Sequence, residues 1–364
     1  MSDESAHFSD DYAQARQKFL DAATAARARI DSHPEPATGM AGERLAMDVA
    51  RLGPDEAALL LVISSGCHGV EGYCGSGVQD ALLQDAALLD QAHRDGVALL
   101  FIHALNPWGF SHGRRVTREG VDLNRNMLRF ERGLQRNAGY DDIAQALLPA
   151  EWPPTPAVDQ VLARYAQAHG AKALQAAISA GQYHHPDGLF HGGTAPTWSN
   201  STLRLVLRQH GTRCARLGWI DVHSGLGASG VGERIFACRD DATALHRAQS
   251  WWGPKVTSAY DGSSTSVGTQ GNIWEAAYEE CAQAQYTGIG LEFGTQPMEV
   301  VRDALRADHW VARSTEDLPQ ALREGVRLRM REAFFTDTPA WKQAIVAQGR
   351  EVALQGVRGL ARHG

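Results

Sequence analysis

The chain has 364 residues, of which 43% are hydrophobic, with 35 basic and 42 acidic side chains and a net charge of −7. This composition can build a large core, and the absence of any block of like charge argues against nucleic acid or an anionic membrane as a partner and favours a small or peptide-like substrate. No apolar run reaches the ~18 residues of a membrane span, no signal peptide is recognisable, and five scattered cysteines suit reduced thiols, so we expect a cytoplasmic protein.

The first part of the chain predicts a helix followed by strands of a parallel sheet. Apolar residues at helical spacing predict a helix over residues 10–30, and we assign residues 1–35 to this N-terminal helical segment. Residues 57–63 and 97–102 are apolar runs of strand length, separated by a helical pattern over residues 75–91, whereas residues 44–53 are ambiguous. The order strand, helix, strand implies a parallel pair, and ligands bind beyond the carboxyl ends of such strands.

Ligand-type side chains follow the first apolar run directly. Residues 64–72 read Ser-Ser-Gly-Cys-His-Gly-Val-Glu-Gly and place His68 three residues before Glu71. Imidazole nitrogen and carboxylate oxygen bind zinc, and a catalytic zinc site needs a third protein ligand. Other histidines in the chain precede an acid at the same spacing, so the surrounding sequence must decide whether His68 and Glu71 are metal ligands. Cys67 is either a further ligand or a small buried residue.

The middle of the chain is predicted to hold loops and a helical insertion. Residues 106–126 are rich in turn formers and polar groups, which is typical of a functional loop. Residues 141–180 are Ala-rich and helical, and residues 181–200 are rich in Gly, Pro, His and Trp, so we interpret residues 141–200 as a helical insertion that ends in a lid or pocket wall. Three histidines of this stretch suggest either a second metal site or a polar lid: His184, His185 and His191.

Two later strands carry further chemistry. Residues 219–225 form a short apolar strand that closes on His223, and residues 287–295 form another with Glu292 inside its apolar part. The remaining pattern comprises helices at 201–216, 242–252 and 297–360, a strand at 233–238 and a loop at 260–268. Since no repeat or linker interrupts it, we predict a single α/β domain over residues 1–364.

These side chains together predict one metal centre. A parallel sheet would bring His68, Glu71 and His223 to one edge as the three ligands of a single Zn²⁺ ion. Such an ion lowers the pKa of its bound water to about 7 and polarises a carbonyl. Glu292, an acid in an apolar strand, could then serve as the general base.

Polar residues of the 106–126 loop complete the predicted site. Arg115 and Arg125 supply the positive charge that an oxyanion or a substrate carboxylate requires. Arg114 and Arg118 lie close enough in sequence that either could take the place of Arg115. Asp122 could hold a ligand histidine in its tautomer.

Four motifs in order give the chain a resemblance to a known superfamily. They are His-Gly-Val-Glu at 68–71, Gly-Val-Asp-Leu-Asn-Arg-Asn at 120–126, Asp-Val-His-Ser at 221–224 and Leu-Glu-Phe-Gly at 291–294. In this order they resemble the zinc metallocarboxypeptidases, the clan of carboxypeptidase A and of the aspartoacylase and succinylglutamate desuccinylase deacylases. The amino-acid sequence of these motifs is most similar to a bacterial branch of the superfamily that is catalogued as a domain of unknown function.

The resemblance implies a mixed, mostly parallel sheet of about eight strands between helices. It also implies roles: His68, Glu71 and His223 as zinc ligands, Glu292 as general base, Arg115 at the oxyanion, Asn124 and Arg125 at the substrate's terminal carboxylate, and Asp122 and Ser224 as supporting residues. No tyrosine matches the one that caps the substrate in carboxypeptidases. Tyr260 is our prediction for it, with Tyr183 and Tyr286 as alternatives.

The predicted function is a zinc hydrolase that cleaves an amide bond next to a carboxylate-bearing residue in short peptides or peptide-like molecules. Two alternatives remain open. One is a deacylase of N-acyl amino acids, which uses the same metal and base. The other is a non-catalytic protein that binds carboxylates through zinc, although pure binding has no need of Glu292.

Overall fold

The protein is described by a computed structural model that covers residues 4–362, built around one mixed sheet. Its strands are β1 (Arg29–Thr38), β2 (Arg44–Leu52), β3 (Leu59–Ser65), β4 (Val97–His103), β5 (Arg216–Ser229), β6 (Gly232–Phe236) and β7 (Gln285–Gly294). They lie in the order β1-β2-β4-β3-β5-β7-β6. The four inner strands β4, β3, β5 and β7 are parallel, and β1, β2 and β6 are antiparallel to their neighbours. The α/β class and the mostly parallel sheet are confirmed, with seven strands described.

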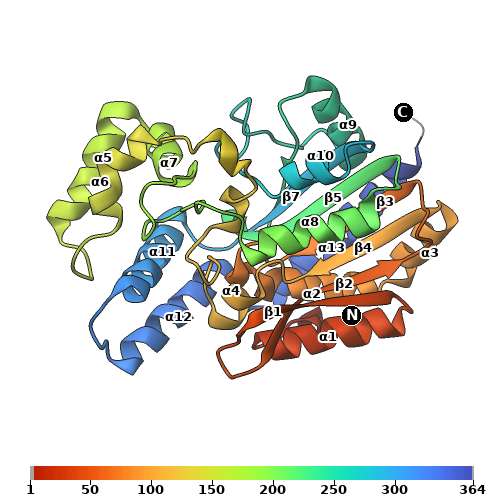
Figure 1. Cartoon of the computed structure of the whole chain (residues 1–364), viewed down its shortest axis with the longest axis horizontal. Coiled ribbons are helices and arrows are strands. Elements are labelled where there is room, and N and C mark those ends of the chain that lie inside the picture. The colour runs from red at the N-terminus through yellow and green to blue at the C-terminus, as the bar shows by residue number, and fades with distance from the viewer. Residues whose placement is uncertain (1–3, 363–364) are drawn as a thin grey trace.

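Helices cover the sheet on both faces. They are α1 (Tyr12–Ala25), α2 (Gly72–Leu83), α3 (Ala86–Arg94), α4 (Pro107–His112), α5 (Ala138–Leu147), α6 (Pro156–His169), α7 (Ala171–Ser179), α8 (Trp198–Gly211), α9 (Ala242–Trp252), α10 (Glu275–Glu280), α11 (Met298–Arg313), α12 (Gln320–Phe334) and α13 (Pro339–Ala361). Short 3-10 turns are η1 (Glu4–His7), η2 (Gly69–Glu71), η3 (Leu123–Arg125) and η4 (Phe130–Arg132). In Figure 1, α8 lies in front of the strands and α13 behind them.

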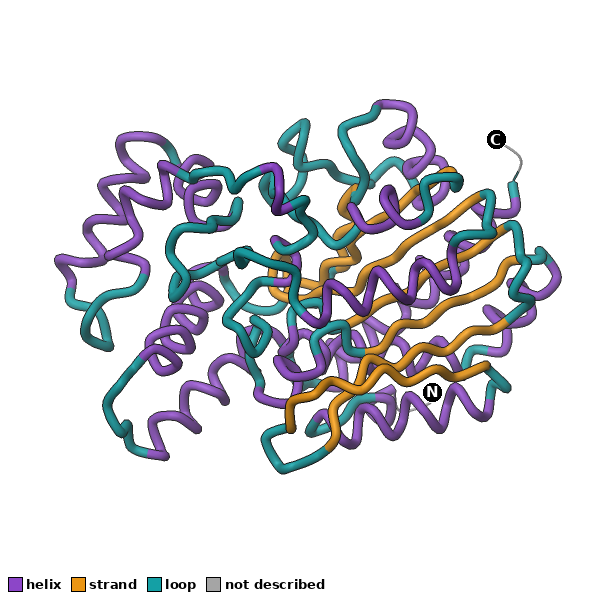
Figure 2. Tube along the Cα trace, viewed as in Figure 1, coloured by secondary structure: helices purple, strands orange, loops and turns teal. Residues whose placement is uncertain are grey.

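The covered faces explain why the inner strands are so apolar. Every residue of β4 is buried, and in β3 all but Leu59 are buried, as expected for strands packed between two helical layers. A second group of helices, α5–α7 with α11 and α12, lies beyond one end of the sheet (Figure 1). Loops gather between that group and the strand ends (Figure 2). This end of the sheet is where the ligand-type side chains meet.

The N-terminal prediction was wrong in its extent. The helix ends at Ala25 and the chain turns into β1 at Arg29, short of the ends predicted at residues 30 and 35; residues 1–3 of the predicted segment lie outside the described residues. The turn uses a left-handed Arg27, φ 59°, and the N–H of Ala28 binds the carbonyl of Ala23 at 2.9 Å. This helix ending normally carries glycine, so an arginine there gave no stop signal.

The edge strand that follows was also hard to see in the sequence. β1 is an alternating, half-exposed strand that includes Pro34 and Pro36, and proline is tolerated only at a sheet edge. Its partner is β2, the stretch of residues 44–52 that had been ambiguous. The helical pattern over residues 75–91 is two helices, because Asp85 caps α3 by accepting from the N–H of Leu88.

The remaining predictions from composition concern cysteines and membranes. All five cysteines are free and buried. Among residues 4–362, no helix combines the length and apolar character that crossing a membrane requires.

Candidate metal centre

The strand order creates the site. The chain leaves β3 towards β4 on one side and returns to β5 on the other, so a crevice opens beyond the carboxyl ends of β3 and β5. His68 and Glu71 follow β3 through η2, and His223 lies in β5 one residue past its last pairing with β3 at Val222. The edge of the parallel sheet therefore brings the three side chains together, as the sequence predicted.

A close approach of two backbone segments fixes the turn that carries His68. A Cβ added to Gly69 would lie 2.1 Å from the carbonyl carbon of Gly109 in α4, so only glycine fits here. The N–H of Gly69 binds the carbonyl of Arg115 at 3.1 Å, and the N–H of Val70 binds that of Arg114 at 2.9 Å. The turn is thus tied to the loop that holds Arg115.

The three predicted ligands converge on one point. His68 Nδ1 lies 2.8 Å from Glu71 Oε1, and His223 Nδ1 lies 2.9 Å from Glu71 Oε2. One ligand atom from each residue lies within 4.8 Å of the others, and all three side chains are buried. Within residues 4–362 this is the one such group, so the histidines of the insertion and Cys67 form no second cluster of this kind.

Each imidazole is held on its far side by an aspartate. His68 Nε2 lies 3.3 Å from Asp122 Oδ1, and His223 Nε2 forms an ion pair with Asp221. Asp122 was predicted for this place, but Asp221 was not. A signal existed, because residues two apart in a strand share a face and Asp221 precedes His223 by two in β5.

The residues present fit a divalent cation. Both Nδ1 atoms face the same carboxylate, and Asp221 behind Nε2 of His223 favours the tautomer in which Nδ1 can bind a metal. Nε2 of His68 faces both Asp122 and an N–H of Arg115, whose Nη2 lies 2.8 Å away. Burial opposes the ionisation of Glu71, yet the neighbouring imidazoles hold its pKa below its usual range. Two imidazole nitrogens and one carboxylate are a ligand set that zinc accepts.

Glu292 lies next to this group. It stands on β7 directly opposite His223 in the parallel register of β5 and β7, and its Oε1 accepts the N–H of Leu226 at 2.9 Å. Burial, together with the negative charge of Glu71, raises the pKa of Glu292 to about 7. A carboxyl group with that pKa can take up and release a proton near neutral pH.

Arg115 is the arginine of its loop that reaches the ligands. Its Nη1 lies 3.0 Å from Glu71 Oε1, and its Nε donates to Asp122 Oδ2 at 3.1 Å. Arg114 instead forms an ion pair with Asp308 on α11, with Nε 2.9 Å from Oδ2. Since Arg115 lines the cavity described below and Arg114 and Arg118 do not, the structure separates the three candidates by position.

The two residues predicted to grip a carboxylate also lie at the site, but they are partly engaged. Arg125 is buried, and three of its five N–H groups bind backbone carbonyls, those of Ser179 and Asn124, at 2.7 to 3.2 Å. The Asn124 side chain accepts the N–H of Ile273 at 2.9 Å through Oδ1, which leaves its NH₂ group available. Arg125 also lies over the ring of Phe190, with its central carbon 5.6 Å from the ring centroid.

Ser224 and Tyr260 occupy different surroundings. The Ser224 hydroxyl donates to the carbonyl of Phe334 at 2.6 Å, and its backbone N–H lies 3.3 Å from Glu71 Oε2, so this residue touches a ligand through its main chain. Tyr260 is half-exposed and its hydroxyl donates to the carbonyl of Cys238 at 3.0 Å. Tyr183 and Tyr286, the alternatives to Tyr260, are buried and bind backbone carbonyls, and neither lines the cavity.

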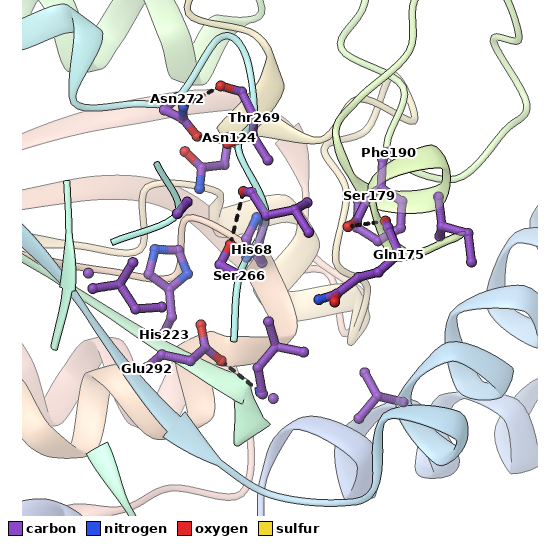
Figure 3. Close-up of a pocket in the computed structure, with 18 of the residues that line it drawn as sticks. His68, Asn124, Gln175, Ser179, Phe190, His223, Ser266, Thr269, Asn272 and Glu292 are labelled. Atoms are coloured by element: carbon purple, nitrogen blue, oxygen red, sulfur yellow. Dashed lines mark hydrogen bonds between the residues drawn. The ribbon is translucent and has the colours of Figure 1, made fainter. Parts of the chain in front are cut away.

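A cavity of about 340 Å³ opens beside the metal-ligand group. Figure 3 shows His223, Glu292 and His68 on one side of it, Asn124, Thr269 and Asn272 above, and Gln175, Ser179 and Phe190 across from them. The last three come from α7 and the loop after it, so part of the 141–200 insertion forms a wall of the cavity. Gln175 Nε2 donates to the carbonyl of Thr265 at 2.8 Å and joins this wall to the 258–271 loop.

With this geometry established, comparison with known proteins places the chain in a family. Residues 8–348 match the family described as "Protein of unknown function (DUF2817)". The chain belongs to the DUF2817 family. This confirms the resemblance to a branch catalogued as a domain of unknown function. No curated protein matches this DUF2817 chain.

Several solved structures are similar to the DUF2817 chain. Carboxypeptidase A from Helicoverpa armigera is 14% identical with a TM-score of 0.42, and the match covers 89% of this chain and 73% of that one. A metallo-carboxypeptidase from Pseudomonas aeruginosa is 12% identical with a TM-score of 0.45, covering 95% and 69%. A putative metallopeptidase from Shewanella amazonensis is 16% identical with a TM-score of 0.41, covering 83% and 92%. At such TM-scores the likeness assigns neither activity nor substrate.

Proposed function

We propose that this protein is a zinc-dependent hydrolase that cleaves an amide bond next to a carboxylate-bearing residue in short peptides or peptide-like molecules. The observation that carries the proposal is the placement of Glu292 opposite His223, beside three convergent ligand atoms at the wall of a cavity. A site that only held zinc would need the three ligands but no acid with a pKa near neutrality beside them.

The chain's residues divide the work as follows. His68, Glu71 and His223 would hold one zinc ion, which when bound polarises a carbonyl and lowers the pKa of water to about 7. Glu292 takes the proton of the attacking water and passes it to the leaving amine. Asp221 keeps His223 in the orientation and tautomer that ligation needs, and Asp122 and Arg115 together orient His68.

Positive charge and hydrogen-bond donors serve the substrate. Arg115, which contacts both Glu71 and Asp122, supplies the charge that stabilises a developing oxyanion. The free NH₂ group of Asn124 and the two remaining N–H groups of Arg125 bind the terminal carboxylate. Ser224 supports Glu71 through its backbone, and Tyr260, which lines the cavity, is the proposed tyrosine contact of the substrate.

The test compares the parent with Glu292→Gln. Both proteins are loaded with zinc, their metal content is measured, and each is offered a panel of dipeptides and N-acyl amino acids. We expect Glu292→Gln to retain zinc and to lose roughly 100- to 10,000-fold in turnover, the usual contribution of a general base. Glu332→Gln, which removes an exposed carboxylate on α12, is the matched control and should behave as the parent.

The panel also discriminates among functions. Turnover of dipeptides supports a peptidase, and turnover of N-acyl amino acids alone would make the protein a deacylase. If the zinc-loaded parent and Glu292→Gln are equally inactive on every substrate, the proposal is wrong and the result favours the protein that binds carboxylates without catalysis. Arg125→Ala should impair turnover of these substrates, all of which carry a terminal carboxylate, and should leave turnover of the corresponding C-terminal amides unchanged.

A further inference from the structure

Helix α11 presents one face to the cavity, and this face contains an unexpected charge. Met298, Val301, Arg302 and Leu305 all line the cavity, and their spacing of three and four residues puts them on one side of the helix. Three of the four are apolar. The fourth, Arg302, places a cation in an apolar stripe, where a side chain that only packs would be uncharged.

The guanidinium of Arg302 has few hydrogen-bond or ion-pair partners within residues 4–362. Its Nε is shielded from solvent and has no hydrogen-bond partner. The acidic oxygen near this Nε is Oδ1 of Asp303, at 3.8 Å. Asp303 is exposed, and the same oxygen lies closer to Nη1 of Arg306, at 3.3 Å. Its Nη1 and Nη2 form no hydrogen bond within the described residues, and the side chain is 27% exposed, so these two groups are the donors that a ligand in the cavity can reach.

The other two arginines of the cavity differ in this respect. Arg115 contacts Glu71 and Asp122, and Arg125 binds the carbonyls of Ser179 and Asn124. Both therefore have partners inside the protein before any substrate arrives. Arg302 is the cavity arginine whose guanidinium makes no hydrogen bond to the described chain, and its two Nη groups, unlike the shielded Nε, are free to bind a carboxylate.

Its position relates it to the far end of a substrate. In Figure 3, Asn124 lies at the top of the cavity, His68 and His223 lie at the middle and left, and the blue helices of the C-terminal part, which include α11, lie at the lower right. A substrate whose terminal carboxylate meets Asn124 and whose scissile bond meets the ligand group would extend its acyl side away from Asn124. The wall formed by α11 lies on that side.

One other charge belongs to this wall. Glu299 also lines the cavity but is exposed, at the edge of the face defined by Met298 and Arg302. No ion pair within 4.0 Å joins Glu299 to Arg302 in the described chain. Glu299 therefore leaves the charge of Arg302 available, although it lowers the local attraction for an anion.

We propose that Arg302 determines specificity by binding a carboxylate on the acyl side of the scissile bond, so that peptides with an acidic residue there are preferred. This rests on the proposed function, since it assigns a substrate class to the same cavity. Loss of a charge-assisted hydrogen bond at a partly exposed site corresponds to about a tenfold change in specificity.

The test measures kcat/KM of the zinc-loaded protein for N-acetyl-Glu-Leu and for its isosteric neutral counterpart N-acetyl-Gln-Leu. The parent should prefer the acidic peptide about tenfold. Arg302→Gln should abolish this preference and leave kcat/KM for the neutral peptide within about twofold, while Arg302→Lys should keep part of the preference. The matched control is Arg329→Gln, which removes the same charge from an exposed position on α12 outside the cavity. Glu299→Gln should strengthen the preference.

The outcomes separate the two proposals. If the parent cleaves both peptides at equal rates, or if Arg302→Gln keeps the preference, Arg302 does not determine specificity and the hydrolase proposal stands. If the parent cleaves neither peptide, calorimetry of both peptides with zinc-loaded parent and Arg302→Gln decides. Tighter binding of the acidic peptide that disappears in the variant supports the role of Arg302 in a non-catalytic protein. Equal or undetectable binding overturns it.

Discussion

Replacing Asp221 by Asn should weaken zinc binding without unfolding the protein. Asp221 forms an ion pair with Nε2 of His223, and its other oxygen accepts from the hydroxyl of Ser64, which in turn accepts from Nε1 of Trp219 at 2.7 Å. An asparagine keeps the shape: its oxygen can still face His223, and its NH₂ can donate to the Ser64 oxygen in place of the hydrogen bond that Ser64 donates to Asp221. What it removes is the negative charge behind the ligand imidazole.

The size of the effect follows from that loss. A partner of this kind is usually worth roughly 10- to 100-fold in metal affinity, which corresponds to about 1.4 to 2.7 kcal/mol. Zinc affinity is measured by competition with a chromophoric chelator at fixed pH, and circular dichroism of the zinc-free proteins checks folding. Asp240→Asn removes an exposed carboxylate after β6 and serves as the control. Unchanged zinc affinity in a folded Asp221→Asn would refute the assignment of Asp221 as the support of His223.

Three further predictions concern pH and packing. Because its pKa is raised to about 7, and a bound cation would lower it, Glu292 should give the pH profile of kcat/KM an acid limb at about pH 7 or below, with activity rising as the pH rises. Activity that falls as the pH rises from 5 to 7 would contradict its role as a base. Burial lowers the pKa of His103 from 6.5 to about 4, so the stability that its neutral ring contributes is complete above pH 6.5 and is lost as the pH falls towards 4. Because His210 and His309 are shifted in the same way, urea unfolding should show a loss between pH 7 and 5 that is smaller by about 2 kcal/mol in His103→Gln, and an equal loss in parent and variant would contradict this. Gly69→Ala should destabilise the protein by about 1 to 3 kcal/mol and weaken zinc binding, because the added Cβ would meet the backbone of Gly109. Gly325→Ala is the control and should do neither, since nothing lies within 4 Å of its added Cβ. Equal melting temperatures for the two variants would disprove this packing argument.

Much of the site was predictable because it depends on strand ends. His68 and Glu71 follow an apolar run, His223 closes another, and the carboxyl ends of parallel strands meet at one edge of a sheet. That rule requires only that the runs be recognised as strands. The inner strands of this sheet are covered on both faces, so their sequence signal is strong.

Features that depend on packing between distant segments were not predictable. β1 is polar, alternating and interrupted by prolines, and its pairing is set by β2 rather than by its own sequence. The role of Asp221 follows only once β5 is known to place Asp221 and His223 on the same face of the strand. Arg302 lies about ten residues past the last site residue, in a helix whose apolar periodicity gives no indication of a cavity. Its exposure to the cavity results from where α11 packs.

We expect His68, Glu71 and His223 to bind one zinc ion. Anomalous diffraction at the zinc edge from crystals of the zinc-loaded protein tests this directly. We predict a single strong peak bound by two imidazole nitrogens and one carboxylate, with Glu292 beside it. A peak bound by other side chains, such as the histidines of the 141–200 insertion, or no peak in protein that retains its fold, would contradict the proposed metal centre.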